Sequence, residues 1–175
     1  MLPTEAFRGT VERFIAILKA FEIRHHLTGG VVSVAWGEPR LTQDIDIVID
    51  RLGQSVVEDL ANGIRAAGYF TDEPSMRTAI HTGKPFPSLD QFEVLQLAVY
   101  PRELIPGELN RSVLAEVFPS SSIAIVSRLD AALSKLLCIH RGSHKSRRDL
   151  RQFFGRLSTD EQVAWRTSAE PLKAA

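Results

Sequence analysis

The sequence predicts a mixed α+β fold with a helical C-terminal third. Three observations predict it: apolar residues at helical spacing near the N-terminus, short runs of β-forming residues through the middle of the chain, and successive helical patterns after residue 127. With 175 residues, 44% of them hydrophobic, the chain can bury a full apolar core without disulfides. We expect one compact unit, with an α/β core over residues 1–126 and a helical part over residues 127–175 that packs on it.

The N-terminal half is predicted to begin with a packing helix from Thr4. Its apolar residues recur at helical spacing: Phe7, Val11, Phe14, Ile15 and Leu18. After it we expect helical turns over residues 31–36, a strand over 44–50, an amphipathic helix over 56–67 and a strand from residue 69. Gly37 and Gly68 end the two helical segments, because glycine is favoured just past a helix C-terminus.

The C-terminal half is predicted from proline, β-forming and capping residues. Pro74 opens a short helix as a first-turn proline, and residues 83–87 break it. Residues 91–100 are rich in β-formers and mostly apolar, as in a central strand. The remaining elements are a strand over 123–126 and helices over 127–141, 143–154 and from 158, where Ser127 and Ser158 are the N-caps.

Composition excludes several classes of protein. The single cysteine, Cys138, lies in an apolar run, so we expect a buried small hydrophobe, and no disulfide can form within one chain. Charged residues interrupt the N-terminal apolar positions, so we predict no signal peptide. No apolar run is long enough to cross a bilayer. We therefore expect a cytoplasmic protein with no membrane partner.

Charge is unevenly distributed although the formal net charge is zero. Residues 128–156 hold two acids, Asp130 and Asp149, against eight basic residues: Arg128, Lys135, Arg141, Lys145, Arg147, Arg148, Arg151 and Arg156. Such a basic strip suits a polyanionic substrate. A solvated helix face is the alternative interpretation.

Acidic and apolar residues alternate after residue 43. In an extended segment Asp44 and Asp46 share one face and the isoleucines take the other. At about 3.3 Å per residue the two aspartate Cα atoms lie about 6 to 7 Å apart, so both carboxylates can reach the same divalent cations. Upstream, Gly29-Gly30 allows a phosphate to approach the backbone closely, and a simple tight turn is the alternative there.

Two motifs together resemble a known family. The first is Gly29-Gly30 followed by Gly37-x-x-Arg40-x-Thr42-x-Asp44-Ile45-Asp46. The second is Ser127-Arg128-Leu129-Asp130, then Lys135, then Arg148-Asp149-Leu150. In this form and spacing the chain resembles nucleotidyltransferases of the DNA polymerase beta-like superfamily, most of all the AbiEii-type toxin nucleotidyltransferases and related bacterial proteins. The resemblance covers about residues 25–155.

The resemblance implies a nucleotidyltransferase-like mixed β-sheet flanked by helices. It also implies Mg²⁺-dependent transfer of NMP from an NTP to an acceptor hydroxyl, with release of pyrophosphate. Two Mg²⁺ ions would be held by Asp44, Asp46 and a third carboxylate, for which Glu93 is the first choice and Asp90 the second. The phosphates would be held by Gly29, Gly30, Arg40, Thr42 and Lys135. Asp149 would support Lys135 or accept the proton of the attacking hydroxyl.

Structural alternatives exist for these residues. Lys135 is the one charge in an apolar helical run, so it either marks the solvent stripe or projects into a polar site. Asp149 could instead form a surface ion pair. Arg40 or Thr42 could shape the turn without binding phosphate. Glu93 could be a strand-edge residue, which would leave the carboxylate set incomplete.

Three functions follow from the resemblance and these alternatives. The first is a toxin of a toxin–antitoxin pair that modifies tRNA or a protein, with a cognate antitoxin as partner; the basic strip favours it. The second is an adenylyltransferase of small molecules such as antibiotics. The third is a degenerate, non-catalytic protein that binds a nucleotide or a partner.

Overall fold

The computed structural model describes residues 4–36, 44–144 and 146–173. Its centre is a seven-stranded mixed sheet with the strand order β3-β4-β5-β2-β1-β7-β6. The strands are β1 (His25–Thr28), β2 (Asp44–Ile49), β3 (Tyr69–Phe70), β4 (Phe86–Asp90), β5 (Gln96–Tyr100), β6 (Val113–Phe118) and β7 (Ser121–Ile125). Central β2 runs antiparallel to β1 and parallel to β5. The predicted α+β class is confirmed.

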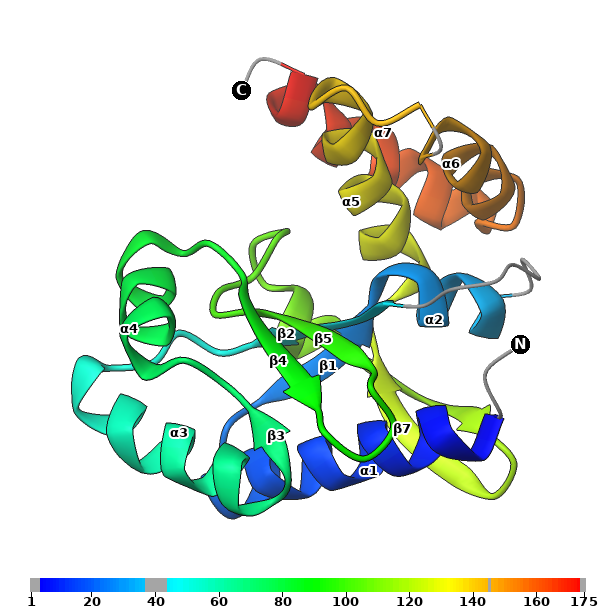
Figure 1. Cartoon of the computed structure of the whole chain (residues 1–175). Coiled ribbons are helices and arrows are strands. Elements are labelled where there is room, and N and C mark those ends of the chain that lie inside the picture. Colours follow the sequence, from blue (N-terminus) through cyan, green and yellow to red (C-terminus); the bar gives the residue numbers. More distant parts are fainter. Residues whose placement is uncertain (1–3, 37–43, 145, 174–175) are drawn as a thin grey trace.

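Helices cover the sheet from two sides (Figure 1). On one side lie α1 (Thr4–Ala20) and α3 (Val57–Ala66), and on the other stand α5 (Arg128–His140), α6 (Ser146–Gly155) and α7 (Thr159–Lys173). The remaining helices are α2 (Gly29–Ala35), α4 (Glu73–Thr82) and the 3-10 turns η1 (Gln54–Val56) and η2 (Glu108–Arg111). Among the described helices, none is both long and apolar enough to cross a membrane.

Strand β2 has an apolar face, which points into the core, and a polar face on the opposite side of the sheet. Its residues Ile45 and Ile47 are fully buried in the core cluster that also contains Phe14 of α1. Because successive side chains of a strand point to opposite faces, Asp44 and Asp46 lie on the other face. The alternation seen in the sequence thus has the expected structural meaning.

One predicted strand differs from the structure. Residues 91–100 were expected to form a single central strand, but only Gln96–Tyr100 is extended, as β5, and a turn precedes it. Residues 83–87 end the helix as predicted, since α4 stops at Thr82 with Gly83 as its left-handed cap, but a strand that was not predicted, β4, already begins at Phe86 and includes Pro87. Pro87 is tolerated because β3 pairs with β4 only at Leu89 and Asp90, so the edge of Pro87 that faces away from β5 carries no ladder bond. Strands β1 and β6 were not predicted either.

A buried polar cluster joins β1, η2 and the start of α5. Ser127 caps α5 by accepting a bond from the Asp130 backbone N–H (3.1 Å), and Arg111 binds both carboxylate oxygens of Asp130 at 2.9 and 2.7 Å. His26 and Glu108 are fully buried, with Nε2 and Oε2 3.9 Å apart. Burial lowers the pKa of His26 to about 4 and raises the pKa of Glu108 to about 7, so both side chains favour their neutral forms.

Glu108→Gln is expected to remove a pH-dependent loss of stability. Between the ordinary pKa of 4.5 and the folded-state pKa of about 7, the unfolded chain releases the Glu108 proton while the folded chain keeps it, so stability falls as pH rises. The free energy of unfolding of the variant, relative to the native chain, should therefore rise by about 2 kcal/mol between pH 5 and pH 8. Urea titrations of both proteins across this range measure the difference. A pH-independent difference would show that Glu108 ionises normally.

Candidate active site

The glycine turn and Asp46 lie in direct contact. Thr28, the last residue of β1, is the cross-strand partner of Asp46, and Gly29 follows with a φ of +69°. A Cβ placed on Gly29 would overlap the Asp46 carboxylate. Glycine is therefore required at position 29 for two reasons: the backbone is left-handed, and a side chain would have no space.

Asp46 is the electrostatic centre of the site. Burial raises its pKa, the positive charge of Lys135 and a hydrogen bond to the Gly30 backbone lower it, and the negative charge of Asp44 raises it. The Tyr100 hydroxyl also donates a long hydrogen bond to Asp46 Oδ1, at 3.4 Å. Residues from β1–α2, β2, β5 and α5 therefore converge on this carboxylate.

Lys135 lies on the side of α5 that faces the sheet. It is half-buried, and its charge acts on Asp46. Of the two positions that the sequence allows, the structure thus favours projection into a polar site over the solvent stripe. Cys138, three residues further along α5, contributes to raising the pKa of Tyr100, so it lies near the same site. It is exposed, so the expectation of a buried thiol was wrong: Leu136 of the same run is buried in a core cluster, whereas Cys138 lies on a solvent-facing side of α5.

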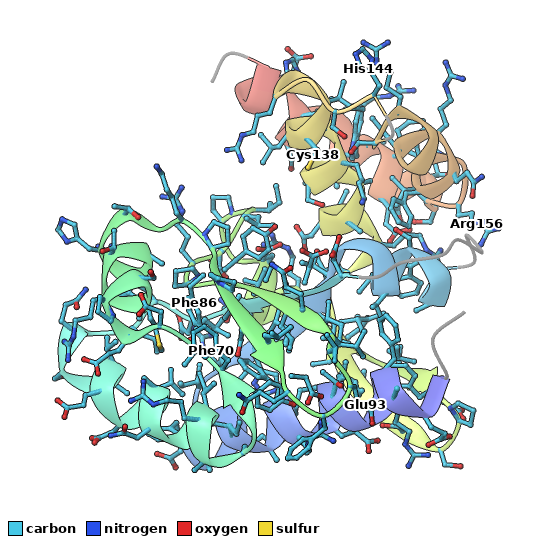
Figure 2. All side chains as sticks on the ribbon, in the orientation of Figure 1. Phe70, Phe86, Glu93, Cys138, His144 and Arg156 are labelled. Carbon is cyan, nitrogen blue, oxygen red and sulfur yellow. The ribbon has the colours of Figure 1, made fainter. Side chains whose placement is uncertain are left out.

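The expected third carboxylate is not beside the pair. On the same face of neighbouring β5, Gln96 is the partner of Asp44 and Ala98 is the partner of Asp46. Glu93 is exposed in the turn between β4 and β5. Figure 2 shows it near α1, with Cys138 of α5 at the opposite end of the view. The structure does not bring Glu93 together with the aspartates, because the turn carries it past the end of the sheet.

Asp90, the second choice, faces the wrong side of the sheet. It is fully buried and accepts hydrogen bonds from Thr10 and Arg13 of α1. Strand alternation puts it on the face of Ser88 and away from that of Leu89. Asp90 therefore anchors α1 to β4 and is not available as a metal ligand. Within the described part of the chain, no group of three or more His, Cys, Asp or Glu residues is arranged to hold a metal ion.

Some expected residues cannot be placed at the site. Arg40 and Thr42 lie outside the described residues. Arg148 and Asp149 belong to α6, which packs against α5, but their side chains are outside the described part. Their roles stay predictions.

Two residues that the sequence did not single out connect to this region. Tyr100 shares the face of Gln96 and Ala98, and its period-two spacing from Gln96 was the available signal. Trp36 joins α2 to the helical part: its indole N–H donates to the Val126 carbonyl at 3.3 Å, and the Arg128 guanidinium lies 4.7 Å from its ring centre. Arg156 donates to the Trp36 carbonyl. Arg128 and Arg156 of the basic strip thus tie α5 and the end of α6 to α2.

Known structures share this architecture. No protein-family model and no curated protein matches the sequence. The solution structure of the antibiotic-resistance factor ANT(2'')-Ia is similar with a TM-score of 0.68 at 12% identity, covering 99% of this chain and 95% of that one.

Two crystal structures are also similar. A nucleotidyltransferase-like antigenic protein from Paracoccidioides brasiliensis gives a TM-score of 0.57 at 14% identity, with 95% and 88% coverage of this chain and that one. The lincomycin-bound lincosamide antibiotic adenylyltransferase LnuA gives 0.51 at 16% identity, with 87% and 96% coverage. The chain has the nucleotidyltransferase fold.

Proposed function

We propose that this protein is a nucleotidyltransferase that transfers NMP from an NTP to an acceptor hydroxyl. The observation that carries the proposal is the convergence of Gly29-Gly30, the Asp44–Asp46 pair and Lys135, which come from three separate segments, at one point of the polar sheet face. Similarity to the folds of ANT(2'')-Ia and LnuA supports it.

The residues have distinct roles in this reaction. The glycine turn offers its backbone to the triphosphate without side-chain obstruction, and Lys135 offsets phosphate charge. The acceptor oxygen attacks the α-phosphorus, the bond from that phosphorus to the bridging oxygen breaks, and pyrophosphate leaves. We propose Asp149 as the acceptor of the hydroxyl proton or as a support for Lys135.

The donor set suits a hard divalent cation. Mg²⁺ is commonly held by one or two carboxylates, with phosphate oxygens and water completing the octahedron, and Asp44 and Asp46 provide two carboxylates on one face. When bound, such an ion would acidify the acceptor hydroxyl and neutralise the leaving pyrophosphate. Because Glu93 does not lie beside the pair, we propose that Asp44 and Asp46 are the protein ligands of the bound Mg²⁺.

The acceptor class has two candidates. A tRNA or protein acceptor, for a toxin that an antitoxin restrains, is supported by the exposed basic residues Arg141, Arg147 and Arg151 on α5–α6. A small-molecule acceptor is supported by the structural similarity to an antibiotic-resistance factor and a lincosamide adenylyltransferase.

Label transfer tests the proposal. The protein is incubated with Mg²⁺ and each of the four NTPs carrying ³²P at the α-phosphate, in separate reactions with bulk tRNA, with cell protein and with aminoglycoside or lincosamide. We expect label in one acceptor pool with one preferred NTP. Label on RNA or protein supports the first class of acceptor, and label on the antibiotic supports the second.

Alkylation of Cys138 separates an inactive nucleotide-binding protein from one that binds no nucleotide. Cys138 is exposed, lies near Tyr100 of the site and is the one cysteine of the chain, so iodoacetamide reports on it alone. Mg-NTP at ten times its Kd should slow the reaction about 10-fold, because the bound fraction is shielded. Protection without transfer would leave the third, non-catalytic function; neither protection nor transfer would reject both enzyme classes.

A further inference from the structure

The polar face of the sheet continues beyond the aspartates as an open row of uncharged side chains. Asp44 of β2 pairs with Gln96 of β5, Gln96 pairs with Leu89 of β4, and Leu89 pairs with Phe70 of β3. Directly paired residues of neighbouring strands point to the same face. Phe70, Leu89 and Gln96 therefore lie in line with Asp44 on the face that carries the candidate site, and we call these three residues the β3–β5 row.

This row is accessible to a ligand. Phe70 is 60% exposed and Leu89 is 37% exposed, although both are large apolar residues within a sheet. Their strand neighbours Tyr69 and Asp90 are fully buried on the opposite face, where Tyr69 donates to the Thr10 carbonyl of α1. One side of β3 and β4 thus packs against the core, and the other side is exposed to solvent. Exposed aromatic surface beside a group of polar site residues is typical of ligand binding.

The spacing of the row fits a ring that a spacer separates from the reacting hydroxyl. Neighbouring strands lie about 4.8 Å apart, so Leu89 is about 10 Å and Phe70 about 14 Å from Asp44. A ring joined to a hydroxyl beside Asp44 through a spacer, such as a sugar or a linked nucleotide, would lie over Leu89 and extend toward Phe70. None of the three side chains is charged, so the row offers apolar and stacking contact but no counter-charge for a polycation.

We propose that the β3–β5 row is the acceptor subsite, and that it binds an uncharged planar ring of the molecule that carries the reacting hydroxyl. The proposal rests on the proposed function, because it takes Asp44 as the reacting end of the row. A nucleoside at the end of an RNA and a free small molecule with a planar ring share this chemistry. A polycationic sugar such as an aminoglycoside does not share it.

Equilibrium binding tests the subsite without requiring catalysis. The donor site is first filled with Mg²⁺ and α,β-methylene-ATP, and 2-aminopurine riboside or a short single-stranded RNA that ends in 2-aminopurine is then titrated by its fluorescence. Phe70→Ala should weaken binding of the probe about 10-fold or more, since base–aromatic stacking has this magnitude. Similar affinity for both probes indicates a free ring as the ligand; much tighter binding of the RNA indicates a polynucleotide.

Phe92→Ala is the matched control. Phe92 is 69% exposed, about as much as Phe70, but its ring lies 5.3 Å from the Arg13 guanidinium of α1, on the other side of the sheet. Its replacement should change the Kd of the probes less than twofold. The subsite proposal is overturned if Phe70→Ala binds like the native protein, if neither probe binds the native protein, or if an aminoglycoside displaces the probes at lower concentration than free nucleoside. Phe70-dependent binding without any label transfer would reject the proposed function and keep a ring-binding surface.

Discussion

Asp46→Asn is expected to lower the rate of NMP transfer by about 100- to 1,000-fold. The change keeps the size of the side chain and an oxygen that can accept the bond from Tyr100, but it removes one of the two carboxylates available to a cation. Losing several kcal/mol of electrostatic stabilisation in the transition state has an effect of this size. Burial raises the pKa of Asp46, so a neutral amide should not destabilise the fold.

Asp50→Asn is the control for this substitution. Asp50 follows directly after β2 and belongs to the same run of alternating acids, but its carboxylate pairs with Arg24 at 2.7 Å at the far end of the strand. Initial rates with the acceptor found by label transfer, and melting temperatures, are measured for both variants. Transfer by Asp46→Asn at the native rate would show that the metal ligands are elsewhere.

Gly29→Ala is expected to damage the site and the fold together. The methyl group would meet the Asp46 carboxylate, and the backbone of Gly29 is left-handed with φ of +69°. A non-glycine residue in this region costs about 1–2 kcal/mol before any overlap is counted. Because misplacement of a reacting group by about 1 Å can reduce the rate about 100-fold, we expect a loss of that order in transfer.

Gly142→Ala separates backbone strain from the overlap. Gly142 also has a positive φ, +93°, but a Cβ there would have nothing within 4 Å. Chemical denaturation of both variants should show a smaller loss of stability for Gly142→Ala, and its transfer rate should stay at the native level. Equal losses of unfolding free energy in the two variants would show that the Asp46 side chain moves away from the new methyl group without destabilising the protein.

Short-range patterns predicted the parts of the site that lie on one element. Period-two alternation placed Asp44 and Asp46 on one face of β2, and the glycine pair indicated a tight turn; both depend on a few neighbouring residues. Register between strands cannot be predicted in this way. A strand over all of residues 91–100 would have allowed Glu93 to lie beside Asp44 and Asp46. In the structure residues 91–94 form a turn, and Gln96 and Ala98 are the partners of the two aspartates.

Long-range contacts decided the remaining residues. Nothing in the sequence distinguishes Asp90 from an acidic residue on the polar face of a strand. Its hydrogen bonds to Thr10 and Arg13 of α1 place it on the core side of the sheet. Cys138 belongs to an apolar run, yet the way α5 packs leaves its thiol exposed. Phe70 gave no functional signal, because its place in line with Asp44 depends on three successive strand pairings.

The sequence by itself determined the α+β class, the aspartate pair and the glycine turn, because these follow from the periodicity and backbone preferences of adjacent residues. Tertiary structure alone decided which side chains stand beside the pair: Lys135 and Tyr100 do, and Glu93 and Asp90 do not. The physical reason is that strand register and helix docking are set by burial of the whole core, to which residues distant in the chain contribute together.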